Sequence, residues 1–231
     1  MTTPLVGALA IGLGWAGFGT IHSLSTRVWP KLAAERLLGT AFLAGGYRAI
    51  YVLISLVTAG WLWLLPGRLS GDILLFSFPA SLWFLPYLVK ASAAGLGMLV
   101  FRQLDFFEFL GVAQLLRWRC GELDRLPVAS PGDFPMTQAP DPVACGGAYL
   151  WVRHPLNTGA ILWIWAQPAY TLYNTVFALG LTLYVAVGVI LEERDLLHRY
   201  GASYARYQAV VPAFIGGFSG LRARKMVLEQ P

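Results

Sequence analysis

Apolar residues dominate five stretches of the sequence, and polar or charged positions separate these stretches from one another. Each stretch approaches the roughly 20 apolar residues that a helix needs to cross the hydrocarbon core of a membrane. Because lipid leaves backbone hydrogen bonds unsatisfied in any other open structure, the stretches are predicted to be helices. The five predicted spans are residues 4–21, 50–65, 82–101, 156–173 and 175–191. This pattern predicts an all-α integral membrane protein with about five transmembrane helices.

Three segments outside these spans carry expectations of their own. Residues 72–80 are apolar but short, and Pro79 interrupts them, so we expect an interfacial or re-entrant piece. Residues 103–151 form a long cytoplasmic loop rich in proline and glycine, which we expect to act as a ligand-binding lid. Leucines and tyrosines recur at helical spacing over 196–207, which predicts a C-terminal amphipathic helix bent at Gly201.

Composition supports the membrane interpretation. Hydrophobic residues make up 57% of the 231 positions and charged residues only 13%, which is too apolar for an ordinary water-soluble domain. The net charge of +5 does not indicate nucleic acid, because the basic residues flank apolar runs instead of forming a stripe of their own. The simplest organisation is one membrane-embedded domain over residues 1–221, followed by a basic tail over 222–231.

The basic residues also predict the orientation of the chain. Arginine and lysine gather after the first and third spans and after the last one, whereas the opposite loops carry only Arg68. Because cytoplasmic loops are enriched in these residues, we expect the N-terminus outside and the C-terminus in the cytoplasm. Lys90 lies within the third span, where a charge costs about 2.5–3.5 kcal/mol on insertion scales. Snorkelling to the outer interface and a functional role both remain open for it.

Cysteine and histidine usage gives no metal-site motif. Cys120 and Cys145 fall in the predicted cytoplasmic loop, where thiols stay reduced, so we expect no disulfide. The histidines, His22, His154 and His198, are scattered, and no Cys-x-x-Cys pair is present. A haem or a single-metal site assembled in space stays open.

The densest polar cluster lies at the cytoplasmic mouth of the fourth span, where Arg153, His154 and Asn157 stand close together. Gly147 allows a close backbone approach to a ligand, and Pro155 suits a helix start whose free N–H groups favour a carboxylate. Anchoring of the helix end at the lipid headgroups is the alternative explanation.

A second cluster, Glu192 and Glu193, stands where the fifth span leaves the membrane. The turn between the fourth and fifth spans is too short to separate them, so both clusters are expected to face each other. Neighbouring helical residues point about 100° apart, so at most one of the two carboxylates is expected to share a pocket with His154. The other would meet water or Arg194. A solvated helix end is the alternative explanation for the whole cluster.

These motifs together resemble the isoprenylcysteine carboxyl methyltransferase superfamily over residues 141–212. The matching positions are Arg153-His154-Pro155 with Gly159, Glu192-Glu193-x-x-Leu196, Tyr200-Gly201-x-x-Tyr204-x-x-Tyr207 and Val211-Pro212. Earlier positions are similar to its bacterial branch of membrane methanethiol S-methyltransferases: His22-Ser23, Tyr47-Arg48, Asp105-Phe106 and Gly111-x-x-Gln114. The resemblance implies a multi-pass protein of the bacterial inner membrane, S-adenosylmethionine as cofactor, and a small or lipophilic thiol or carboxylate as methyl acceptor.

The resemblance also implies which residues form the site. The catalytic candidates are His154, Arg153 and Glu192. The implied cofactor-binding residues are Val143, Ala144, Gly147, Tyr149, His154, Pro155, Leu156, Asn157 and Glu192. For His154 two roles stay open, a general base toward the acceptor and a donor to the cofactor carboxylate. Asn157 replaces a tyrosine of the family and Gly188 an arginine that binds a prenylcysteine carboxylate, which argues against that substrate.

Two other classes of function stay open. His22-Ser23 and Arg153-His154-Pro155 are also similar to the NnrU group, which includes a haem-dependent carotene isomerase, and there His22 or His154 would ligate iron. The glutamate pair and the tyrosine-rich tail fit the methyltransferases better. A transporter or membrane assembly factor would give Lys90 a role but would leave the cytoplasmic cluster unexplained.

Overall fold

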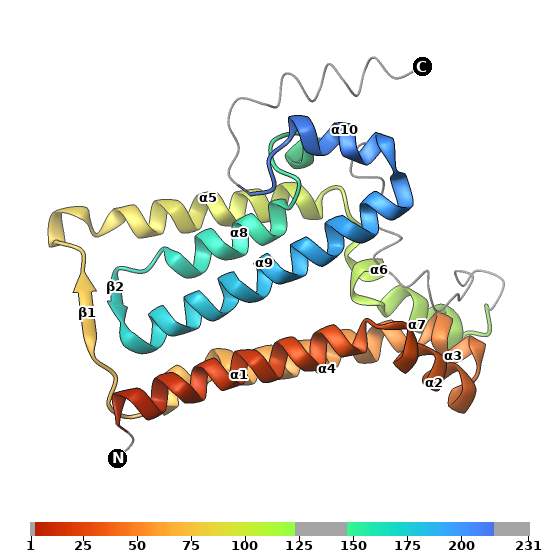
Figure 1. Cartoon of the computed structure of the whole chain (residues 1–231), viewed down its shortest axis with the longest axis horizontal. Helices are drawn as coiled ribbons and strands as arrows, with labels where there is room; N and C mark the ends of the chain where they lie inside the picture. Colours follow the sequence, from red (N-terminus) through yellow and green to blue (C-terminus); the bar gives the residue numbers. More distant parts are fainter. Residues whose placement is uncertain (1–2, 123–146, 215–231) are drawn as a thin grey trace. The chain divides into compact units, whose positions relative to one another are not determined.

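The computed structural model describes residues 3–122 and 147–214, and most of these lie in helices (Figure 1). Within these residues, four helical stretches are long and apolar enough to cross a membrane. They are α1 (Pro4–Ser25), α4 (Tyr47–Leu64), the stretch Ala80–Phe101, which contains α5 (Phe84–Phe101), and α9 (Leu172–Tyr200). The prediction of an all-α integral membrane protein is confirmed.

Helix α8 (Pro155–Trp165) is shorter than the span predicted over residues 156–173. Its 11 residues rise about 16 Å at 1.5 Å per residue, roughly half of the hydrocarbon thickness. The helix stops at Ala166 because Gln167 precedes Pro168, and the residue before a proline avoids the helical conformation. The predicted helix is therefore wrong beyond Trp165, where strand β2 (Ala169–Thr171) follows.

Strand β1 (Leu74–Ser77) occupies the middle of the segment that we expected to be interfacial or re-entrant. It pairs antiparallel with β2, with Leu74 opposite Thr171 and Ser77 opposite Ala169. Aromatic side chains cover the pair, because the Phe76 ring lies 6.2 Å from that of Tyr170 between centroids. The apolar character of the segment thus belongs to a small sheet, and its place in the membrane stays a prediction.

Contacts divide the described residues into two compact units. The first comprises the described parts of Met1–Ala8, Ser70–Gln103 and Pro140–Pro231, and the second those of Leu9–Leu69 and Leu104–Ala139. In the first unit α5, α8 and α9 lie side by side, with the β1–β2 sheet at one end of this layer and α10 (Ala202–Val210) at the other (Figure 1).

A tight connection sets the direction of α9 against α8. The Thr171 side chain accepts a hydrogen bond from the Asn174 N–H, and the Asn174 side chain accepts one from the Thr171 N–H. This reciprocal capping starts α9 directly after β2. Gly159 brings α8 close to α5, since a Cβ there would lie 3.2 Å from the Ala93 carbonyl oxygen. The start of α8 and the last turns of α9 therefore meet at one end of the layer.

The second unit contains helices where the sequence predicted only a loop. Its short helices are α2 (Val28–Leu38), α3 (Thr40–Gly45), α6 (Phe106–Leu110) and α7 (Val112–Arg119), beside α4. Asp105 starts α6, because its side chain accepts hydrogen bonds from the N–H groups of Phe107 and Glu108. The prediction for 103–151 thus did not include the helices over 106–119, and the cytoplasmic position of this segment stays a prediction. Residues 123–146 of that loop lie outside the described residues, and Gly147–Leu150 form the 3-10 helix η5.

The predicted break at Gly201 is confirmed. Helix α9 runs to Tyr200, Gly201 takes a φ of 54°, and α10 begins at Ala202. Glycine tolerates this left-handed backbone, which turns the chain back across the end of the layer. Val211 is extended, as expected for the residue before Pro212, and ends α10.

Lys90, which lies in α5, contacts one polar and two aromatic side chains. Its Nζ donates to Gln167 Oε1 at 3.4 Å and lies 5.9 Å from the Tyr87 ring centroid and 5.7 Å from that of Trp163. Aromatic faces attract a cation, so these contacts compensate part of the cost of an ammonium in an apolar helix.

Candidate functional site

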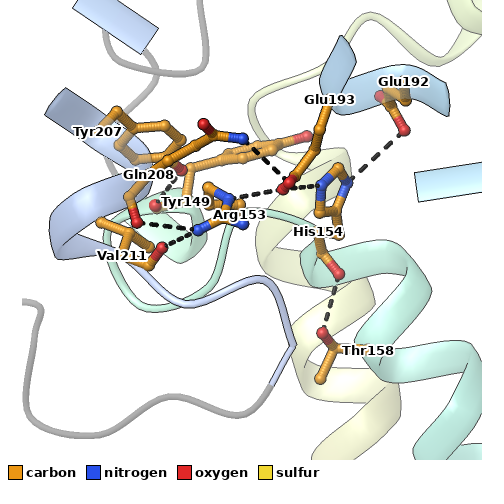
Figure 2. Close-up of polar contacts among 9 residues, drawn as sticks. All are labelled: Tyr149, Arg153, His154, Thr158, Glu192, Glu193, Tyr207, Gln208 and Val211. Atoms are coloured by element: carbon orange, nitrogen blue, oxygen red, sulfur yellow. Dashed lines mark hydrogen bonds and ion pairs between the residues drawn. The ribbon is translucent and has the colours of Figure 1, made fainter. Parts of the chain in front are cut away.

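The polar cluster lies where α8 begins, α9 ends and α10 crosses the end of the layer (Figure 2). Arg153 and His154 immediately precede α8, Glu192 and Glu193 lie late in α9, and Gln208 comes from α10. Figure 2 shows that these side chains converge, although about 40 residues separate the first pair from the second in sequence. The expectation that the two clusters face each other is met by this geometry.

Glu193 accepts hydrogen bonds from three side chains. Its Oε1 lies 2.7 Å from Arg153 Nε and 3.0 Å from His154 Nε2, and its Oε2 accepts from Gln208 Nε2 at 3.0 Å. The pair is well shielded, with the Arg153 side chain 11% exposed and that of Glu193 17% exposed. Charge-assisted hydrogen bonds in such surroundings are short and strong. Glu193 therefore joins the start of α8 to α9 and α10.

Arg153 also holds the segment after α10. Its Nη1 donates to the carbonyl oxygens of Gln208, at 3.2 Å, and Val211. The backbone N–H of Arg153 donates to Pro212 O at 2.9 Å, and that of His154 to Ala213 O at 3.1 Å. These two bonds fix the chain just before α8. The expectation of a carboxylate at the helix start concerns the N–H groups of Leu156 and Asn157 in the first turn of α8, and for them it stays a prediction.

His154 is nearly inaccessible to solvent, at 5% exposure, and lies between two carboxylates (Figure 2). Its Nε2 faces Glu193 at 3.0 Å, and its Nδ1 lies 3.6 Å from Glu192 Oε2, beyond hydrogen-bonding distance. Burial lowers the pKa of His154 below its ordinary value of 6.5, and the Glu193 carboxylate opposes this shift only in part. The imidazole is accordingly neutral at neutral pH.

Tyrosines of α10 pack beside the cluster. Tyr204 and Tyr207 are 1% and 3% exposed and pack with the fully buried Val211. The Tyr207 hydroxyl donates to the Tyr149 carbonyl oxygen at 2.6 Å, which ties α10 to η5. Burial raises the pKa of Tyr204, so its hydroxyl stays protonated. The tyrosine-rich segment thus forms part of the walls of the site.

Comparison with known proteins identifies relatives over most of the chain. It is 30% identical over 223 residues to a methanethiol S-methyltransferase of Crocosphaera subtropica, a match that covers 91% of this chain and 76% of that protein. A methanethiol S-methyltransferase of Mycobacterium tuberculosis is 30% identical over 216 residues, covering 91% of this chain and 79% of the relative.

The chain belongs to the methanethiol S-methyltransferase family.

Other members match over less of their length. The chain is 33% identical over 172 residues to a methanethiol S-methyltransferase of Pseudomonas deceptionensis, covering 70% of this chain. It spans 56% of that relative and only 26% of another protein named methanethiol S-methyltransferase 2. No family model and no solved structure matches the chain. Membership confirms the bacterial branch expected from the sequence motifs and identifies a methyltransferase-like membrane protein.

The structure brings some of the predicted site residues of this family member together and leaves others apart. Arg153, His154 and Glu192 form one cluster, and Pro155, Leu156 and Asn157 follow in the first turn of α8. Gly147 and Tyr149 lie in η5, whose end leads directly to Arg153. Val143 and Ala144 lie outside the described residues.

Glu193 and Gln208 are the residues that sequence reasoning missed. Helical periodicity predicted that only one of the two glutamates would share a pocket with His154. In the structure the imidazole ring lies between them, with Nδ1 facing Glu192 and Nε2 facing Glu193. The doubled glutamate was the available signal for Glu193. The sequence carries no signal for Gln208, because a single glutamine on an amphipathic helix does not indicate a site unless its hydrogen-bond partner is known.

Proposed function

We propose that this protein is an integral membrane methyltransferase that uses S-adenosylmethionine to methylate a small or lipophilic thiol such as methanethiol. The observation that carries the proposal is the buried His154 between Glu192 and Glu193, in a member of this family. A thiol acceptor needs a group that takes its proton, and a neutral, buried imidazole with a carboxylate on either side suits that task.

The side chains of the site suit S-adenosylmethionine. S-adenosylmethionine, when bound, supplies a methyl group already activated by a sulfonium, and it carries an ammonium that needs an acceptor. Glu192 meets that need, because its side chain is 28% exposed and its nearest described partner, His154 Nδ1, is 3.6 Å away. In-line displacement then requires mainly alignment and exclusion of water, so few polar groups suffice.

Arg153 has a different place in this scheme. Its Nε and Nη1 are engaged with Glu193 and with two carbonyl oxygens. We therefore assign it to positioning Glu193 and His154, and not to contact with the reactants. His154 and Glu192 remain the groups proposed to meet the reactants, and the orientation deduced from the arginines puts them on the cytoplasmic side of the bacterial inner membrane.

Binding measurements on the purified protein test this function. Calorimetric titration in detergent is expected to show micromolar binding of S-adenosylmethionine and of its demethylated product. Glu192→Gln should weaken binding about tenfold or more, equivalent to about 1.4 kcal/mol. His198→Asn, an exposed position in α9, is the matched control and should bind like the wild type. A Soret band in the visible spectrum without cofactor binding would instead support the haem-binding alternative and overturn the proposal.

A further inference from the structure

The protonation pattern around His154 follows from its contact with Glu193. That carboxylate is paired with the Arg153 guanidinium at 2.7 Å and also accepts from Gln208. An ionised carboxylate has only acceptors, so the His154 Nε2 that lies 3.0 Å from Glu193 Oε1 must carry a proton. A neutral imidazole has one N–H, and here it is the one on Nε2.

The other ring nitrogen is then a lone pair that points toward a second acceptor. His154 Nδ1 and Glu192 Oε2 are 3.6 Å apart, too far for a hydrogen bond to each other. A donor placed about 2.9 Å from each would nevertheless reach both, since that triangle closes easily. The pair can therefore accept a hydrogen bond from a group that has a hydrogen to give, such as an S–H or an ammonium.

Resting on the function proposed above, we infer that Glu193 is a positioning residue that fixes His154 as the Nε2–H tautomer and so makes Nδ1 the nitrogen that takes the acceptor's proton. The S–H bond of the thiol breaks, and its proton moves to Nδ1. The sulfur uses the freed electron pair to bond the methyl carbon, while the bond from that carbon to the sulfonium breaks toward the leaving thioether. The imidazolium later releases its proton to water.

This inference decides between the two roles that the sequence left open for His154. A donor to the cofactor carboxylate would need a hydrogen on Nδ1, because Nε2 is already committed to Glu193. Among the described residues, the charged groups that act on the ring are Arg153 from the start of α8 and Glu192 and Glu193 from α9, while Tyr204 from α10 acts on these three side chains. Of these, only Glu192 lies on the Nδ1 side within ion-pair distance.

Nitrogen-15 NMR on the full chain in detergent tests the tautomer directly, without cofactor. The three histidines make assignment simple, since His22→Asn and His198→Asn each remove one signal pair. In the wild type at neutral pH, we expect His154 to show a protonated Nε2 and an unprotonated Nδ1. A proton on Nδ1 in the wild type would overturn the inference.

A matched pair of variants tests the cause. In Glu193→Met, which keeps side-chain volume but removes the acceptor at Nε2, the His154 proton should move to Nδ1, because the Glu192 carboxylate 3.6 Å away then gives the remaining electrostatic attraction. In Glu192→Met the Nε2–H form should persist. The inference fails if both variants keep the wild-type tautomer.

The isosteric Glu193→Gln covers the case in which Glu193→Met does not fold. It should lower the His154 pKa measured by the same spectra and lower kcat about a hundredfold, within the range for loss of general-base catalysis, with little change in the cofactor KM. A cofactor KM that rises as much as kcat falls would contradict a role confined to His154.

Calorimetric binding separates the two proposals. The wrong tautomer with intact cofactor binding defeats only this inference, and absent binding defeats the proposed function.

Discussion

At the scale of single residues, the site depends on a histidine that folding makes a weaker base. Burial removes His154 from water, so protonating it in the folded state costs more than in the unfolded chain. Glu193 limits this cost but does not abolish it. The protein therefore keeps a neutral imidazole available at neutral pH, at the expense of stability in acid.

The lowered pKa of His154 predicts that the free energy of unfolding depends on pH. Because the folded pKa lies below 6.5, the unfolded chain binds more protons as pH falls through 6.5, and the free energy of unfolding decreases there. Above that pH the contribution is constant. Thermal unfolding followed by tryptophan fluorescence should give a Tm that falls in acid more steeply for the wild type than for His154→Gln. Equal slopes for the two proteins would contradict a depressed pKa.

At the scale of elements, the regions that departed from prediction are those where apolar residues pack on protein. Helix α7 reads as loop because Gly111 and the prolines beyond it dominate the local pattern, yet it packs on α3 and α4. Strand β1 and the end of α8 at Trp165 were missed for a related reason. Hydropathy cannot distinguish an apolar segment that contacts lipid from one that pairs as a strand. The long spans and the bend at Gly201 were predictable because length and backbone chemistry alone determine them.

The contact between α3 and α7 gives a packing prediction. A Cβ on Gly45 would lie 2.3 Å from Trp118 Cβ, an atom that cannot move without its backbone. Gly45→Ala should therefore destabilise the protein by about 1–3 kcal/mol through overpacking. Gly60→Ala, in α4 with nothing within 4 Å of its added Cβ, is the matched control and should leave Tm unchanged or raise it. Similar Tm values for both variants would show that α7 does not pack there.

At the scale of the whole molecule, the candidate site lies at one end of the layer formed by α5, α8 and α9. The meeting of His154 and Glu192 was predictable, because the short connection between α8 and α9 returns the chain to the same end. The part played by Glu193 and Gln208 was not, since it depends on the tertiary packing that brings His154 and α10 onto Glu193. Under the proposed function, entry of an apolar acceptor from the lipid would explain why methyl transfer takes place in a membrane protein.

The predicted orientation has its own test. Cys120 is exposed in the structure and falls after the arginine-rich α7, so it should face the cytoplasm. With Cys145→Ser present, a membrane-impermeant thiol reagent should label Cys120 only after the cells are permeabilised. Labelling in intact cells would reverse the proposed topology and put the site on the other side of the membrane.

Methyl transfer by the purified protein is the decisive measurement for the proposed function. Purified protein supplied with S-adenosylmethionine carrying an isotopically labelled methyl group, and with methanethiol, should release labelled dimethyl sulfide. His154→Ala should lower the rate by about a hundredfold or more while remaining folded, and His198→Asn should match the wild type. No labelled thioether from a folded protein that binds the cofactor, or an undiminished rate in His154→Ala, would contradict the account.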